Sequence, residues 1–120
     1  WYLKAAKAGL PSAQFNLGIF YQLGQGARKS AAEAFVWHNR AALQGHASAQ
    51  NNLAYLYFSG EGVEKDAIEA WKWYELASRN LKGDARRIAS ENRDKVSRTL
   101  SSDERTAAKR RADDFNPVRE

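Results

Sequence analysis

The strongest constraint on this chain is that its sequence repeats with a period of 36 residues. Such a period is typical of repeat arrays, in which each unit is one supersecondary element that buries its apolar surface only against its neighbours. A shift of one period superimposes tryptophans, glycines and alanines. The matching sets are Trp1, Trp37 and Trp73; Ala5, Ala41 and Ala77; Gly9 and Gly45; Ala13-Gln14 and Ala49-Gln50; Leu17 and Leu53; Tyr21 and Tyr57; Gly24 and Gly60; Gly26 and Gly62; Ala34 and Ala70.

Each unit opens with a segment that predicts an α-helix. Residues 11–23 and 47–59 carry apolar or small side chains at helical spacing. Gly24 and Gly60 follow these segments directly, and a glycine just past a helix readily adopts the left-handed conformation that ends it. We therefore expect the first helix of each unit to end at these glycines.

A second helix is predicted in each unit. Ser30 is followed three residues later by Glu33, and Asp66 by Glu69, a spacing typical of a capping box. The first of these helices is expected to run to about Leu43. Alanines and a tryptophan form one stripe on each, a pattern that indicates closely packed helices with the tryptophan filling the gap.

Beyond residue 80 the motif fades, because Leu81 stands where the repeat expects a glycine. The remaining residues predict two mostly polar helices, at 84–99 and, after a capping box of Ser101 and Glu104, up to Phe115. Polar outer helices are typical of the terminal caps of solenoids. The predicted domains are repeats at 1–80, made of the second half of one unit and two whole units, and a C-terminal helical cap at 81–120.

These residues resemble the Sel1-like repeat family, whose units run approximately A-x-A-Q-x-x-L-G-x-x-Y-x-x-G-x-G-V and then D-x-x-x-A-x-x-W-Y-x-x-A-A. The first unit departs from this pattern at Ala27, Ser30 and His38, and the second at Ala54. The second unit matches at Ala47, Ala49, Gln50, Leu53, Tyr57, Gly60, Gly62, Val63, Asp66, Ala70, Trp73, Tyr74 and Ala77.

The resemblance covers residues 1–80. It implies an all-α fold, a right-handed α/α superhelix of helix-turn-helix repeats akin to tetratricopeptide arrays, with the last helices as caps. It also implies a scaffold or regulatory adaptor that binds a partner protein or peptide, often in bacteria and often in the cell envelope. It implies neither an enzyme nor a cofactor.

Composition narrows the remaining functions. The absence of cysteine excludes disulfides, thiolate zinc sites and cysteine nucleophiles. No apolar run approaches the roughly 18 residues of a membrane span. His38 and His46 are interpreted as packing and turn residues, since no cluster with metal-ligand spacing surrounds them. A small hydrolase, which would need a polar pocket with perturbed ionisable groups, is the least favoured alternative.

The chain opens on Trp1-Tyr2-Leu3-Lys4, which is typical of a helix interior, so we expect a fragment of a longer protein. The periplasm and the cytoplasm both stay open as compartments. The net charge of +5 raises nucleic acid as an alternative partner. Acids interleave with the basic residues of the tail, however, which favours a solvated face, then an acidic protein partner, then nucleic acid. The basic residues are Arg86, Arg87, Arg93, Lys95, Arg98, Lys109, Arg110 and Arg111.

A partner-binding surface is predicted where the two units differ. Positions identical in both units are interpreted as set by stacking, and positions that differ as free to serve a partner. One stripe on the first helices differs throughout, and first helices line the concave side of stacked hairpins. The alternative, that these side chains only pack against the neighbouring hairpin, stays open. The stripe comprises Phe15, Ile19 and Gln22 in the first unit and Asn51, Tyr55 and Phe58 in the second.

Overall fold

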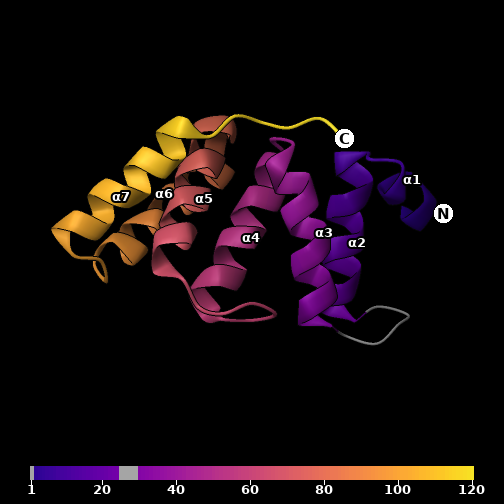
Figure 1. The fold of residues 1–120 in the computed structure, drawn as a ribbon, viewed down its shortest axis with the longest axis horizontal. Helices are drawn as coiled ribbons and strands as arrows, with labels where there is room; N and C mark the ends of the chain where they lie inside the picture. The colour runs from indigo at the N-terminus through magenta and orange to yellow at the C-terminus, as the bar shows by residue number, and fades with distance from the viewer. Residues whose placement is uncertain (1, 25–29) are drawn as a thin grey trace.

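The computed structural model describes residues 2–24 and 30–120, which form seven α-helices stacked along one axis (Figure 1). The array is elongated, with extents of 44 × 26 × 25 Å. The all-α repeat fold predicted from the sequence is thereby confirmed, although Trp1, Gly26 and Ala27 lie outside the described residues. The helices are α1 (Tyr2–Lys7), α2 (Pro11–Leu23), α3 (Ala31–Leu43), α4 (Ala47–Ser59), α5 (Ala67–Asn80), α6 (Gly83–Ser97) and α7 (Ser102–Asp114).

The helices keep nearly the same spacing beyond residue 80, where the sequence motif is no longer found. Helix α4 begins 36 residues after α2 (47 − 11), and α6 begins 36 residues after α4 (83 − 47). Helix α7 packs on α5 and begins 35 residues after it (102 − 67). The loss of register after residue 80 therefore concerns the side chains and not the positions of the helices.

Gly24 and Gly60 end α2 and α4 in the left-handed conformation, with φ of 73° and 75°, as the sequence predicts. Gly62 has a further task. It lies against the first turn of α3 in the preceding hairpin, and a Cβ at this position would clash with the backbone of Ala31. The glycine pair thus ends a helix and admits the neighbouring hairpin.

The second helices are capped differently from the prediction. The side chains of Ser30 and Asp66 accept from the N3 amide as expected, at 3.2 and 3.1 Å. Their own amides donate to the carbonyls of Tyr21 and Tyr57, both at 2.9 Å. Because this bond already satisfies the cap amide, the reciprocal glutamate contact predicted there is wrong. It does form at Ser101, whose amide donates to a glutamate carboxylate at 2.8 Å.

The core between the hairpins is lined with alanine. Such small side chains let helices approach closely, and Trp37 and Trp73, 6% and 2% exposed, fill the space that remains. The fully buried alanines of α3 to α5 are Ala34, Ala41, Ala42, Ala49, Ala54, Ala70 and Ala77.

A buried glutamine bonds α2 to α1, and another bonds α4 to α3. Gln14 and Gln50 are fully buried, and their Nε2 atoms donate to the carbonyls of Ala6 and Ala42, at 3.0 and 3.2 Å. These two carbonyls belong to or adjoin the last turns of α1 and α3. The bond explains why the Ala-Gln pair recurs at the same repeat position.

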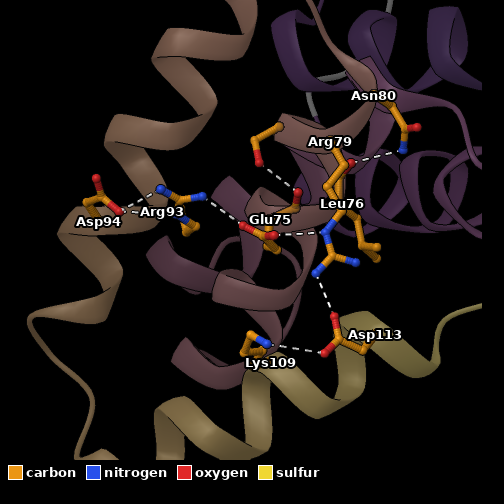
Figure 2. Close-up of polar contacts among 9 residues, drawn as sticks. Glu75, Leu76, Arg79, Asn80, Arg93, Asp94, Lys109 and Asp113 are labelled. Carbon is orange, nitrogen blue, oxygen red and sulfur yellow. Dashed lines mark hydrogen bonds and ion pairs between the residues drawn. The ribbon is translucent and has the colours of Figure 1, made fainter.

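Ion pairs join the last two helices to α5 (Figure 2). Glu75 on α5 accepts from Arg79 of the same helix at 2.8 Å and from Arg93 of α6 at 2.7 Å. Arg79 also donates to Asp113 of α7 at 2.7 Å, which holds the pKa of that carboxyl below its ordinary value. Lys109 lies 3.6 Å from the same carboxylate. Glu75 thus joins α5 to α6, and its partner Arg79 joins α5 to α7.

Gly62→Ala is expected to destabilise the protein more than Gly60→Ala. Both glycines have positive φ, which costs a residue with a side chain about 1–2 kcal/mol. Only Gly62 faces a backbone clash, which adds roughly 1–3 kcal/mol, whereas a Cβ at Gly60 meets nothing closer than the Lys65 Cβ at 3.4 Å. Urea denaturation of the two variants measures the difference. Equal losses would contradict the close approach at Gly62.

Trp37→Ala is expected to lower the free energy of unfolding by roughly 3–5 kcal/mol, the range for truncating a buried large aromatic side chain. Arg110→Ala, an exposed change on α7, should stay within about 0.5 kcal/mol. Denaturant midpoints of both variants test the repeat alignment. The reverse order would contradict it.

Candidate functional site

A hollow with a volume of about 260 Å³ lies between α4 and α6, the first helices of consecutive hairpins. One wall is polar and comes from α4, and the other is mainly apolar. The polar wall is Ser48, Asn51 and Asn52, and the apolar wall is Leu81, Ala85 and Ile88. This wall composition suits a chain segment with one apolar side chain and a polar backbone.

Helical spacing places the lining side chains on common faces. Ser48, Asn51 and Asn52 are three and four residues apart on α4, so they share one side of that helix. The Oδ1 atom of Asn51 is buried and has no hydrogen-bond partner among the described residues. Opposite, Ile88 is 46% exposed. The hollow therefore combines an exposed apolar side chain with a buried acceptor that lacks a donor.

The predicted stripe of the second unit lies partly on this surface. Asn51 lines the hollow, and Tyr55, one turn further along α4, is 47% exposed. A hydrogen bond with Glu61 raises the pKa of the Tyr55 phenol. Phe58 is half-buried against the core, with the Lys65 ammonium 5.4 Å from its ring centre. Asn51 thus lines the hollow, Tyr55 is exposed one turn away, and Phe58 packs against the core.

The stripe of the first unit makes internal contacts instead. Phe15 stacks on His46 with ring centres 4.8 Å apart and lies 5.6 Å from the ring of His38. The Oε1 atom of Gln22 accepts from Nε2 of His38 at 3.1 Å. Ile19 is half-buried. The two stripes predicted as equivalent therefore differ in their surroundings.

Sequence comparison between units missed two polar residues of the hollow. Ser48 and Asn52 have identical partners one period earlier, Ser12 and Asn16, so the rule that identical positions serve stacking passed over them. Both earlier residues are exposed, which shows that identity between units does not imply burial. The sequence signal that could have found them is the set of Ser and Asn side chains three and four residues apart on one face of the predicted helix.

Both histidines belong to the packing of the first hairpins. His38 is fully buried, and Gly18 makes room for it, since a Cβ there would lie 2.5 Å from the imidazole. Burial lowers the pKa of His38 to about 4, with a smaller contribution from the charge of His46. His46, predicted as polar turn surface, is half-buried and caps α4 by accepting from the Ala49 amide at 3.2 Å. Burial lowers its pKa as well.

Much of the basic character of the tail is paired. Arg87 bonds Glu91 one turn away at 3.0 Å, as the interleaved charges predict, and Arg93 bonds its sequence neighbour Asp94 at the same distance. Arg111 reaches Glu69 on α5 at 2.9 Å. Across residues 2–24 and 30–120, no group of three or more His, Asp or Glu is placed to hold a metal ion. In the same stretch, no helix is long and apolar enough to cross a membrane.

Stacked helical hairpins that repeat every 36 residues define an α/α repeat protein. The Sel1 repeat model matches residues 1–10, 11–46 and 47–80. The chain belongs to the Sel1 repeat family, whose fold commonly mediates protein interactions.

Two solved bacterial structures share the fold. The antigen c5321, a protective antigen present in uropathogenic Escherichia coli strains, is 36% identical with a TM-score of 0.88, over 96% of this chain and 24% of the antigen. A Sel1 repeat protein from Oxalobacter formigenes is 44% identical with a TM-score of 0.68, over 71% of this chain and 35% of that one.

Among curated proteins, the chitin synthase regulator SKT5 of Saccharomyces cerevisiae is 51% identical over 37 residues. These residues are 31% of this chain and 5% of the yeast protein. The chain therefore spans at most about a third of the length of these relatives.

Stability is expected to fall as the pH drops from 6.5 toward 4. Because the pKa of His38 is about 4 when folded and 6.5 when unfolded, the unfolded chain binds the proton first. Neutral His38 therefore contributes roughly 3 kcal/mol that is fully present above pH 6.5 and lost on acidification. His38→Tyr should flatten this dependence, since Tyr74 occupies the matching position of the next unit. Urea denaturation at several pH values measures the free energy of unfolding of both proteins. The same dependence of this free energy on pH in wild type and variant would contradict the role given to His38.

Proposed function

We propose that this chain is a non-enzymatic interaction module that binds an extended or helical peptide segment of a partner protein across its first helices. The observation that carries the proposal is the hollow between α4 and α6. Its volume of about 260 Å³ lies below the roughly 300–1,000 Å³ typical of small-molecule sites. A single apolar side chain of a peptide is a better match in size than a cofactor.

In this proposal, each wall of the hollow has its own task. Ile88 and Tyr55, both about half exposed, serve as apolar anchors. Asn51 and Asn52 serve as donors and acceptors for the peptide backbone, which presents both kinds of group. A few anchors of this kind supply most of the binding free energy in protein interfaces.

Residues 81–120 have two tasks in the proposed function. Helices α6 and α7 cap the open end of the array, and α6 also supplies the apolar wall of the hollow. The ion pairs around Glu75 support this arrangement, since they tie both helices to α5. Of the predicted stripe, we keep Asn51 and Tyr55 as the partner-facing part, since Phe58 packs against the core and Phe15, Ile19 and Gln22 are engaged within the first hairpins or half-buried.

The combined change Tyr55→Ser with Ile88→Ser is expected to weaken peptide binding by about 100-fold or more, because each anchor of an interface contributes about 2 kcal/mol. The probe is a set of peptides selected from a random phage-displayed library against the immobilised wild-type chain. The selected peptides are then labelled and titrated by fluorescence anisotropy.

The matched control is Leu3→Ser with Val36→Ser, which removes side chains of similar exposure, 42% and 47%, from α1 and α3. Both double variants should melt within about 4 °C of the wild type. Full binding by the Tyr55 and Ile88 variant, or equal losses in both variants, would refute this surface as the binding site.

A further inference from the structure

After α7 the chain continues as an extended segment, residues 115–120, which runs back along the ends of the hairpins (Figure 1, yellow). Phe115 leaves the helix with φ of −66° and ψ of 130°. Its ring packs edge-on against Trp73 with centres 5.3 Å apart. Pro117 disfavours helix at the residue before it. The segment thus begins at the last hairpin with an aromatic anchor and an extended backbone.

The middle of the segment contacts the turn between α3 and α4. Pro117 packs against Gly45. A Cβ built at this glycine would lie 3.5 Å from the proline ring, an ordinary van der Waals distance. The amide of Val118 donates to the carbonyl of Leu43 at 2.8 Å. Leu43 is the last residue of α3, where carbonyls have no partner within the helix. The segment therefore uses an acceptor that the fold leaves open.

At the far end of the segment, the carboxylate of Glu120 lies among hydrogen-bond donors from Gln14 and Arg40. Glu120 accepts from Arg40 through both of its oxygens, with Nε at 3.3 Å, and from Nε2 of Gln14 at 3.0 Å. The Arg40 guanidinium lies over the ring of Trp37, 5.0 Å from its centre. The hydrogen bond from Arg40 also lowers the pKa of Glu120. At Gly9 a Cβ would come within 2.9 Å of the Glu120 side chain, so only glycine fits.

The donor set is held in place by the fold. Gln14 is fully buried, with its amide also bonded to the carbonyl of Ala6 and its Oε1 accepting from Gln44 at 2.8 Å. A side chain fixed by these two hydrogen bonds presents its second N–H in one direction, which is the direction of the carboxylate. Preorganised donors of this kind are typical of a binding site and cost little to use.

We propose that Gly9, Gln14, Arg40, Leu43 and Gly45, here called the edge site, bind an extended peptide segment through a glutamate carboxylate, and that residues 115–120 fill this site in cis. The ligand class follows from the contacts: a proline on Gly45 and a glutamate three residues later, preceded by an aromatic residue that packs on Trp73 beside the edge site. A partner protein with such a segment competes with residues 115–120, here called the C-terminal segment or tail, for the edge site. The edge site shares no residue with the hollow between α4 and α6, so the two proposals fail or succeed separately.

Hydrogen exchange on the intact chain tests the occupancy in cis. The amide of Val118 is expected to be protected in the wild type, and Arg40→Gln should reduce its protection by about tenfold. Arg110→Gln, a matched change on the exposed face of α7, should leave it unchanged. A Val118 amide that exchanges in the wild type as fast as in an unstructured peptide would overturn the proposal.

A competition experiment tests the ligand class. The probe is an acetylated and amidated hexapeptide, Phe-Asn-Pro-Val-Arg-Glu, titrated into the Glu120→Gln variant, with the peptide ending in Gln as control. The glutamate peptide should bind about tenfold more tightly than the control, the effect of a charge-assisted hydrogen bond. Wild-type protein should bind it more weakly than the variant, because a tethered tail competes at about millimolar effective concentration.

Two outcomes of the competition would overturn the proposal. Equal affinity for the two peptides would show that no carboxylate is recognised. Equal affinity of the wild type and the Glu120→Gln variant would show that the tail does not occupy the site. Sedimentation of the wild type and of the Glu120→Gln variant serves as a further check. A wild-type dimer that dissociates in the variant would mean that residues 115–120 exchange between copies, contrary to occupancy in cis.

Discussion

Close approach between neighbouring helices is the physical condition on which the other features of this array depend. Alanines with no exposed surface line the contacts of α3 to α5, and the two buried tryptophans occupy the space that such small residues leave. Glycine extends the same principle to the backbone, since Gly62 admits the start of α3 and Gly18 admits a histidine ring. Dispersion contacts at this density make each hairpin depend on the next.

The edge along the inter-hairpin turns owes its chemistry to the same stacking. At two junctions, α1 with α2 and α3 with α4, a buried glutamine donates to the end of the preceding helix. Once Gln14 is fixed in this way, its remaining N–H points outward and, together with Arg40, forms a place for a carboxylate. A contact that stabilises the array thus also prepares a surface, which the tail of this chain covers.

The two surfaces of the molecule differ in what they offer a partner. The hollow between α4 and α6 is partly apolar and contains a buried acceptor, Asn51 Oδ1, for which the described part of the chain supplies no donor. The edge site is polar, basic and filled. The two surfaces share no residue, although Ser48 of the hollow lies only three residues after Gly45 of the edge site.

The 36-residue period by itself determined the class of fold, the two helices per unit and the glycines that end α2 and α4, because these depend on local backbone chemistry and on which side chains recur. Tertiary structure decided the rest. Equivalent positions of the two units have different surroundings: Phe15 packs on histidines, whereas Asn51, one period later, lines a hollow. The hollow needs α6, whose spacing continues after its motif has faded, and the edge site needs a tail from the far end of the chain. Neither contact is encoded in a local pattern, since each joins residues that only the stacking of hairpins brings together.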